Sequence, residues 1–176
     1  LSDENENLLN QLLMRNRQVY TDSLTKVFNR RYCDDRLRRL SGEYALAMID
    51  IDNLKQINDC LGHPAGDTAI YHTAQAIRAI LRSQDELVRY GGDEFLLLFH
   101  SLPQNILRRK LEDICRAVRA LRVADLPELR ITVSIGGVYA AGQISELVEK
   151  ADLALYRAKA QKDSAVLYEE DFHDSE

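Results

Sequence analysis

Long hydrophobic runs, an excess of basic residues and an even set of cysteines are all missing from this sequence of 176 residues. No apolar stretch approaches the roughly 18 to 20 residues that a membrane-spanning helix needs, and the opening LSDENENLLNQLL is too polar for a secretory signal. The cysteines Cys33, Cys60 and Cys115 lack metal-site spacing, which indicates free thiols in a reducing compartment. The net charge of −5 disfavours nucleic acid as a partner, because nucleic acid binds basic surfaces.

The composition that remains is typical of a soluble globular domain. Hydrophobic residues make up 45 % of the chain and charged residues 29 %. A chain of this length supports one ordinary core rather than two. Its first residue is leucine rather than methionine, so we expect a fragment of a longer protein from which an upstream sensory domain is missing.

Hydrophobic periodicity predicts alternating helices and strands with a hairpin at the centre. A hairpin in that position requires a mixed or antiparallel sheet, so we expect an α/β fold of the α+β type. Its largely antiparallel central sheet would be flanked by helices and preceded by an N-terminal helix. The expected helices cover residues 5–20, 29–40, 53–62, 63–82, 104–122 and 144–161, and the expected strands cover 43–52, 87–99 as a hairpin, 129–140 and 165–170 at an edge.

The segment RYGGDEFLLLF, residues 89–99, places two glycines and two carboxylates at the tip of the predicted hairpin. Gly91 and Gly92 predict a tight turn, because glycine adopts positive φ without a steric penalty. Asp93 and Glu94 repel each other and resist burial, so we expect a positive group close to them.

A second pair of carboxylates, Asp50 and Asp52, ends the predicted strand EYALAMIDID. If the two strands are neighbours, three or four carboxylate oxygens converge on one spot, as Mg²⁺ requires. Lys55 lies one helical turn beyond Asp52, within reach of the phosphates of a metal-bound nucleotide. The alternative is that these carboxylates are simply solvated at strand ends.

Several ordered motifs together resemble the GGDEF domain of bacterial diguanylate cyclases. RYGGDEF is similar to the family signature, and the resemblance extends over about Asp22 to Tyr168 through TDSLTKVFNRR, DIDNLKQINDCLGHPAGD, TVSIGGVYA and ADLALYRAK. The resemblance implies a sheet related to the palm of nucleotide cyclases and polymerases. It also implies condensation of two GTP molecules into the second messenger cyclic di-GMP, with release of pyrophosphate.

The resemblance assigns roles to individual residues at the metal and the phosphates. Asp50, Asp93 and the main-chain oxygen of Ile51 would hold two Mg²⁺ or Mn²⁺ ions per active site. Asp93 would also help to deprotonate the attacking 3′-hydroxyl, with Glu94 as a weaker contributor. Lys55 would contact phosphates and stabilise the transition state, and the bound nucleotide would lie against Gly91 and Gly92.

Guanine would be recognised by Asn58 and Asp67, with His63 close by. An aspartate accepts hydrogen bonds from guanine N1–H and the exocyclic amine, whereas adenine offers no matching donor pair, so Asp67 favours GTP over ATP. A carboxylate near a helix N-terminus also interacts favourably with the helix dipole, and Asp67 could serve both roles. A lone histidine such as His63 is more often structural.

Two departures from the family pattern stand out. Leu54 replaces the usual phenylalanine, which we expect packing to tolerate. The family commonly has AKxxGRN after its last helix, whereas this chain has AKAQKDS. Lys159 keeps the first phosphate-binding cation, but Asp163 falls where an arginine would complete the grip. We therefore expect weaker GTP binding unless Asp163 turns away and Lys162 substitutes.

The family resemblance also implies an assembly and a feedback site. Each domain binds one GTP, so two domains must face each other as an antiparallel homodimer. The chain would divide into a signalling helix (1–20), a catalytic domain (21–170) and a tail (171–176), although the helix could instead be a remnant packed on the domain. The segment RSQD has the sequence and spacing of the RxxD inhibitory site, so Arg82 and Asp85 would bind cyclic di-GMP.

Three functions compete on this reading. The first is an active diguanylate cyclase with product inhibition. Its GTP substrate would place it in the cytoplasm, either free or tethered to a membrane by an upstream segment. The second is a catalytically weak or inactive receptor for cyclic di-GMP or GTP, which Asp163 alone supports. The third, a purely structural dimerisation module, leaves the polar residues of the motifs unexplained.

Overall fold

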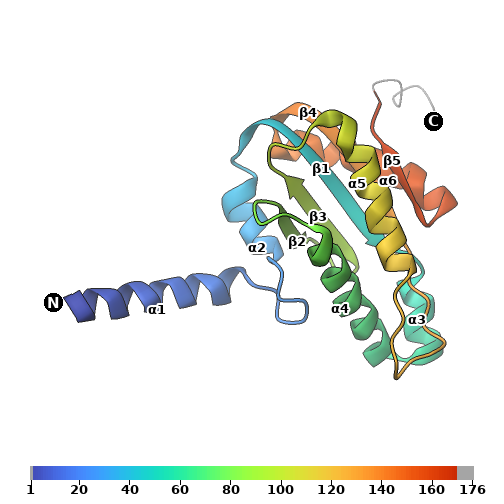
Figure 1. Cartoon of the computed structure of the whole chain (residues 1–176), viewed down its shortest axis with the longest axis horizontal. Helices are drawn as coiled ribbons and strands as arrows, with labels where there is room; N and C mark the ends of the chain where they lie inside the picture. Colours follow the sequence, from blue (N-terminus) through green and yellow to red (C-terminus); the bar gives the residue numbers. More distant parts are fainter. Residues whose placement is uncertain (1, 170–176) are drawn as a thin grey trace.

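A five-stranded sheet forms the centre of the computed structural model, which describes residues 2–169 (Figure 1). Strand β1 pairs antiparallel with β3 and β4, β2 pairs antiparallel with β3, and β5 runs parallel to β4 at the edge. The predicted mixed, largely antiparallel sheet is therefore confirmed. In spatial order the strands are β2 (Glu86–Arg89), β3 (Glu94–Phe99), β1 (Ser41–Ile51), β4 (Val133–Gln143) and β5 (Ser164–Leu167).

Each predicted helix is present, although several boundaries differ. The predicted helix at 29–40 is shorter, and its second half is wound as a π-helix in which the Arg38 amide donates to the Cys33 carbonyl at 3.0 Å. The predicted strand at 129–140 begins only at Val133 and extends to Gln143. The helical segments are α1 (Ser2–Tyr20), α2 (Arg30–Tyr32), η1 (Cys33–Leu37), α3 (Leu54–Leu61), α4 (His63–Ile80), α5 (Gln104–Arg119) and α6 (Ile144–Gln161).

One face of the sheet is covered by α4 and α5, which lie across it in Figure 1. Alternate residues of β1 point to this face, as the period of two of a strand requires. The buried cluster here includes Ala45, Ala47, Ile49, Phe95, Phe99, Ile77, Leu107 and Leu111. This layer fixes α3 and α4 beside the end of β1.

The opposite face is covered by α6 and η1, which pack on Leu46, Met48, Leu96 and Leu98. Helix α6 approaches β4 so closely that a Cβ on Gly136 would lie 2.1 Å from the Ala151 carbonyl oxygen. Glycine at this position is therefore required by helix–strand packing. Residues on both faces of β1 and β3 are buried, which makes the central strands a rigid support for whatever lies at their ends.

Helix α1 extends away from the sheet as a separate rod (Figure 1). None of its residues is buried, and Leu8, Leu9, Leu12 and Leu13 are each more than half exposed. Its C-terminal end contacts the domain, where the Tyr20 hydroxyl donates to Asp35 at 3.1 Å. Among residues 2–169, no helix is long and apolar enough to cross a membrane. The three cysteines are free, as predicted, and the predicted tail 171–176 lies outside the described residues.

Candidate active site

The end of β1 and the tip of the β2–β3 hairpin lie side by side. Asp50 on β1 is in register with Glu94 on β3, and the Ile51 amide donates to the Asp93 carbonyl at 3.0 Å. The two strands are neighbours, which was the condition for the carboxylates to converge. The backbone therefore brings Asp50, Ile51, Asp93 and Glu94 to one edge of the sheet.

The glycines of the hairpin tip do not adopt the predicted positive φ. The amides of Tyr90 and Gly91 both donate to the Glu94 carbonyl, at 2.8 and 3.2 Å, so residues 90–93 form a loop of four residues. Such a loop does not need the left-handed backbone of a two-residue turn. A Cβ on Gly91 would lie 3.1 Å from a Glu94 carboxylate oxygen, whereas a Cβ on Gly92 would meet nothing within 4 Å.

An arginine clamp holds this loop. Arg89 donates from Nη2 to the Gly92 carbonyl at 2.9 Å and pairs through Nη1 with Asp22 at 3.3 Å. Asp22 in turn accepts from the amide and hydroxyl of Thr25, at 2.9 and 2.7 Å. The segment that follows α1 is therefore linked directly to the tip of the hairpin.

Asp50 is buried but only partly neutralised. Lys159 of α6 pairs with its Oδ2, while Oδ1 is buried without a hydrogen-bond partner among the described residues. Burial raises the pKa of Asp50 to about 6, the bond from Lys159 partly offsets this, and the charge of Asp93 adds to it. The same bond raises the pKa of Lys159 above its usual value. The positive group predicted near these carboxylates is Lys159.

Asp52 does not join the other carboxylates, which corrects the prediction that its oxygens converge with them. Its Oδ1 accepts from the Ser134 hydroxyl at 2.6 Å, and its Oδ2 accepts from the Thr132 hydroxyl at 2.7 Å and the Asp163 amide at 2.9 Å. A carboxylate with these three donors has little capacity left for a metal. Asp52 instead ties the end of β1 to the start of β4 and to the turn after α6.

The predicted base-recognition residues gather where α3 meets α4. Gly62, at φ +91°, ends α3 and allows α4 to begin at His63 without a linker. Asn58 packs so tightly on the backbone of α4 that a Cβ on Gly66 would lie 1.8 Å from its Oδ1. Asp67 follows Gly66 directly and is exposed, as is His63. Leu54 is partly buried against the main core, as its apolar character predicts.

Lys55 lies exposed in the first turn of α3, immediately beyond the end of β1. The turn after α6 approaches the same place, since Lys162 donates from Nζ to Asn53 Oδ1 at 2.6 Å. Asp163 turns to α5, where Arg119 donates to both carboxylate oxygens at 2.6 and 3.1 Å. Asp163 therefore turns away from the end of β1, which is the first of the two conditions under which we expected no repulsion of the triphosphate.

Sequence reasoning missed Arg119 as the partner of Asp163, and Thr132 and Ser134 as the partners of Asp52. Arg119 lies 44 residues from Asp163, and no local spacing connects them. Thr132 and Ser134 are hydroxyl residues two apart, ahead of a run of apolar residues. Two hydroxyls on one side of a segment are the signal that could have indicated a buried acceptor nearby.

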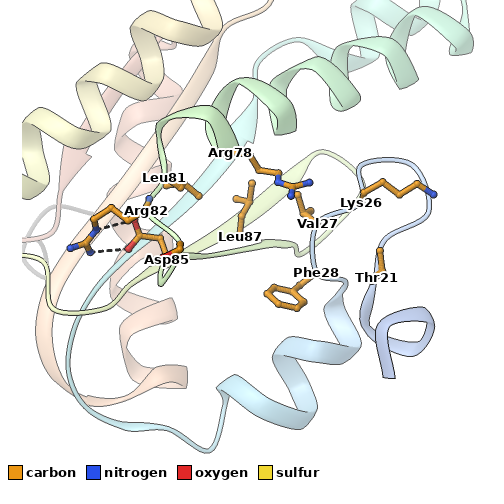
Figure 2. Close-up of a pocket in the computed structure, with 10 residues that line it drawn as sticks. Thr21, Lys26, Val27, Phe28, Arg78, Leu81, Arg82, Asp85 and Leu87 are labelled. Atoms are coloured by element: carbon orange, nitrogen blue, oxygen red, sulfur yellow. Dashed lines mark hydrogen bonds and ion pairs between the residues drawn. The ribbon is translucent and has the colours of Figure 1, made fainter. Parts of the chain in front are cut away.

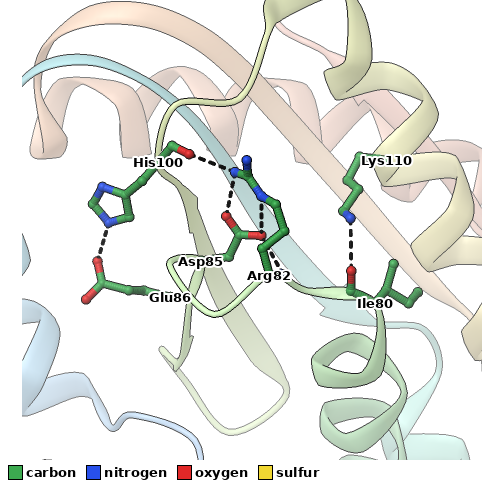
Figure 3. Close-up of polar contacts among 6 residues, drawn as sticks. All are labelled: Ile80, Arg82, Asp85, Glu86, His100 and Lys110. Atoms are coloured by element: carbon green, nitrogen blue, oxygen red, sulfur yellow. Dashed lines mark hydrogen bonds and ion pairs between the residues drawn. The ribbon is translucent and has the colours of Figure 1, made fainter.

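Arg82 and Asp85 are brought together at the start of β2, but they pair with each other (Figure 3). Arg82 donates from its amide, Nε and Nη2 to the Asp85 carboxylate at 2.9, 3.2 and 2.8 Å, and from Nη2 to the His100 carbonyl at 2.7 Å. His100 also pairs with Glu86 at 2.7 Å. The Asp85 side chain is fully buried, whereas that of Arg82 is one-third exposed.

A cavity of about 330 Å³ borders this pair, between α4, β2 and the segment that follows α1 (Figure 2). Its lining combines cationic and apolar side chains, with Arg78 and Lys26 beside Phe28 and Leu87. Such a lining suits a ligand that carries both anionic groups and flat rings.

The residues at the end of β1 fit a divalent cation. Asp50 presents a buried oxygen without a partner, and carboxylate and carbonyl oxygens are the ligands that Mg²⁺ prefers. No group of three or more Asp, Glu, His or Cys side chains among residues 2–169 is arranged to hold a metal. A cation here would therefore need oxygens from the main chain and from phosphate in addition to the two aspartates.

A family model described as diguanylate cyclase, GGDEF domain, matches residues 19–165. This chain belongs to the GGDEF domain family. Among curated relatives of this GGDEF domain, the probable diguanylate cyclase DgcC of Escherichia coli is 34 % identical over 78 % of the chain, and diguanylate cyclase TpbB of Pseudomonas aeruginosa is 35 % identical over 92 %. The chain covers 40 % and 38 % of those two proteins, about two fifths of their length.

Solved structures show the same fold. The coiled coil and GGDEF domain of DgcB from Caulobacter crescentus, in complex with c-di-GMP, matches with a TM-score of 0.84 at 30 % identity, covering 94 % of both chains. Diguanylate cyclase SiaD from Pseudomonas aeruginosa, in complex with its activator SiaC, matches with a TM-score of 0.82 at 35 % identity, covering 94 % of this chain and 68 % of SiaD. Both matches cover a larger share of the chain than residues 19–165, the span of the family model.

Proposed function

We propose that this GGDEF domain condenses two molecules of GTP into cyclic di-GMP and pyrophosphate. The observation that carries the proposal is the buried, unpaired oxygen of Asp50 beside Asp93, with Lys55 and Lys159 at the same edge of the sheet. A site of this kind combines ligands for a divalent cation with cations for a triphosphate. A structural dimerisation module would require neither.

Asp50, Asp93 and the main-chain oxygen of Ile51 would hold the metal, as Mg²⁺ or Mn²⁺. When bound, the metal would neutralise the triphosphate and favour the deprotonated form of the attacking 3′-hydroxyl. Asp93 would accept the proton of that hydroxyl, with Glu94 as a secondary base. Gly92, where a side chain would meet no neighbour in this chain, leaves the backbone open to the approaching nucleotide.

Lys55 and Lys159 would bind the phosphates and hold the α-phosphorus in line for attack. The approach of a cation to Asp50 would free Lys159 from its present partner. Asn58 and Asp67 would hydrogen-bond the guanine edge, with His63 beside them at the start of α4. ATP would leave the Asp67 carboxylate without its two donors, which is how a polar site rejects the wrong base.

Two copies would meet as an antiparallel homodimer, because a domain that binds one GTP supplies only half of the product. Residues 21–170 would form the catalytic domain, and α1, with its exposed leucines, would be the signalling helix that brings two copies together. Cyclic di-GMP would inhibit at Arg82 and Asp85, where the bordering cavity suits an anionic ligand with flat rings. A receptor without turnover is the second candidate, favoured by the change from arginine to Asp163.

The test is incubation of the purified protein with GTP and Mg²⁺ over a series of protein concentrations, with chromatographic separation of the nucleotides. We expect cyclic di-GMP to appear more than linearly with protein, and to be absent in Asp93→Ala. If no product forms even when an added dimerising domain joins two copies, the receptor function replaces this proposal.

A further inference from the structure

The turn after α6 contains a lysine in a backbone conformation that normally requires glycine. Lys162 has φ 60° and ψ 163°, a region that residues other than glycine almost never occupy. Its amide donates to the Ala158 carbonyl at 2.8 Å and so ends the helix. Asp163 follows, also with positive φ, at 45°. Strain of this kind persists only where the surroundings hold it in place, and it is often connected with function.

The Lys162 side chain reaches the C-terminal end of β1, where the proposed metal ligands lie. Its Nζ lies 2.6 Å from Asn53 Oδ1, and Asn53 is the residue between Asp52 and α3. The Asn53 side chain makes no capping hydrogen bond to α3, so it does not occupy the first-turn amides of that helix. The ammonium of Lys162 therefore lies at a helix N-terminus that favours anions, close in sequence to Lys55.

Two contacts hold the turn that carries Lys162. The Asp163 amide donates to Asp52 Oδ2 at 2.9 Å, and the Asp163 carboxylate accepts two bonds from Arg119 at 2.6 and 3.1 Å. A bidentate arginine–carboxylate pair fixes orientation as well as charge. Arg119 therefore both anchors the turn to α5 and neutralises a carboxylate that would otherwise repel a triphosphate.

We propose that Lys162 is a triphosphate-binding cation of this domain and that the Arg119–Asp163 pair is the device that positions it. The inference rests on the proposed function, since it names residues for the same nucleotide. In this proposal Asp163 holds the turn in place. The cation that the family pattern places at position 163 is supplied here by the preceding residue, Lys162. The conformation at 162 is retained because it aims the ammonium at the start of α3.

The first experiment separates ligand binding from stability at position 162. The probe is a GTP analogue with a methylene bridge between its α- and β-phosphates, titrated with Mg²⁺ in a calorimeter, so that no turnover is needed. We expect Lys162→Gln and Lys162→Gly each to weaken its affinity about tenfold, the effect of losing one charged hydrogen bond, and Lys162→Arg to retain it. Glycine relieves the backbone, so we expect Lys162→Gly to raise the Tm by about 2–4 °C while affinity falls.

Ser101 provides a control for the backbone change, because it is a non-glycine residue with φ 55° outside this turn. We expect Ser101→Gly to leave the affinity for the analogue unchanged. Wild-type affinity in both Lys162→Gln and Lys162→Gly would overturn the assignment of Lys162.

The second experiment tests the positioning pair with a double-mutant cycle. Arg119→Ala exposes the charge of Asp163 and should weaken binding of the analogue about fivefold to tenfold. Adding Asp163→Ala to it removes that charge and should recover part of the loss. Arg116→Ala is the control, since Arg116 pairs with Asp113 on the surface of the same helix at 2.9 Å. Additive effects of the two substitutions would overturn the role of the pair.

Asp163→Arg separates this inference from the expectation drawn from the family pattern. An arginine at 163 would face Arg119 and release the turn, so we expect no gain in affinity, whereas a gain would overturn the inference. If wild type binds the analogue but makes no cyclic di-GMP from GTP, catalysis fails and the inference stands. If the lysine variants bind like wild type while product still forms, the inference alone fails.

Discussion

Asp50 at the end of β1 and Asp85 at the start of β2 are both buried carboxylates, but they are neutralised to different extents. Asp85 accepts from the backbone amide, Nε and Nη2 of Arg82, all within 3.2 Å. Asp50 has Lys159 on one oxygen and no partner among the described residues on the other. A carboxylate whose two oxygens both have hydrogen-bond donors is saturated and stabilises the fold. A carboxylate with an oxygen that lacks a partner is unsaturated and retains the capacity to bind a cation.

The same contrast distinguishes the two proposed ligand sites. At the end of β1 a nucleotide with its metal would add the missing partners of Asp50. At Arg82 a bound product would have to compete with an existing ion pair, because the guanidinium already contacts Asp85 and the His100 carbonyl. Filling the active site therefore completes a set of contacts, whereas filling the product site exchanges one set for another.

The largest expected effect comes from removing the charge of Asp50, the carboxylate with an unpaired oxygen. Asp50→Asn keeps the size of the side chain but removes a proposed metal ligand, so we expect the rate of cyclic di-GMP formation to fall by about 10³-fold or more. Initial rates at saturating GTP over a range of Mg²⁺ concentrations measure this. Glu43→Gln, an exposed change on the same strand, is the control. Activity within tenfold of wild type would show that Asp50 is not a metal ligand.

Asp52 lies two residues from Asp50, but both of its carboxylate oxygens have hydrogen-bond donors, as those of Asp85 do. Asp52→Ala leaves the hydroxyls of Thr132 and Ser134 and the Asp163 amide without their acceptor. We expect the free energy of unfolding to fall by about 3 kcal/mol, measured by urea denaturation without metal. If Asp52→Ala is as stable as wild type, the Asp52 carboxylate does not stabilise the fold.

Local pattern was sufficient for most of the fold. The alternation of Ala45, Ala47 and Ile49 with Leu46 and Met48 predicts a strand buried on both faces, and β1 is such a strand. The hairpin also follows from short-range signals, whereas its pairing with β1, which brings Glu94 opposite Asp50, entered the sequence analysis only as a condition. The positive φ predicted for Gly91 and Gly92 was wrong, because the turn has four residues and its hydrogen bonds close around them.

The parts of the site that could not be predicted depend on contacts between distant residues. Asp52 and Asp163 are separated by 111 positions, and the sequence alone does not show which of two neighbouring aspartates is saturated. Asp163 illustrates the consequence: the charge alone predicts repulsion of phosphate, but the Arg119 partner removes that charge from the site. A motif identifies the residue types, and the packing of α5 and α6 on β4 decides what they contact.

The contrast between Asp50 and Asp85 predicts that the protein loses stability when Asp85 loses its arginine partner. Arg82→Ala would leave a fully buried carboxylate with only a backbone donor, so we expect a loss of about 2–3 kcal/mol in the free energy of unfolding. The concentration of cyclic di-GMP that halves the rate should rise at least about tenfold, since the guanidinium is the proposed contact to the product. Asp113→Ala breaks an exposed pair instead and should change stability by less than about 1 kcal/mol. Unchanged inhibition in Arg82→Ala would place the product elsewhere.

The smallest expected effect is the pH dependence that the unpaired oxygen creates. Burial raises the pKa of Asp50 from 3.8 to about 6, so between these values the native state binds more protons than the unfolded chain. Stability contributed by protonated Asp50 is therefore lost as pH rises, by about 2 kcal/mol between about pH 4.5 and 6.5. Asn at this position cannot ionise, so the difference in unfolding free energy between Asp50→Asn and wild type, without metal, should grow with pH over this range. A constant difference would mean that Asp50 is neutralised as fully as Asp85, and the contrast between the two sites would no longer hold.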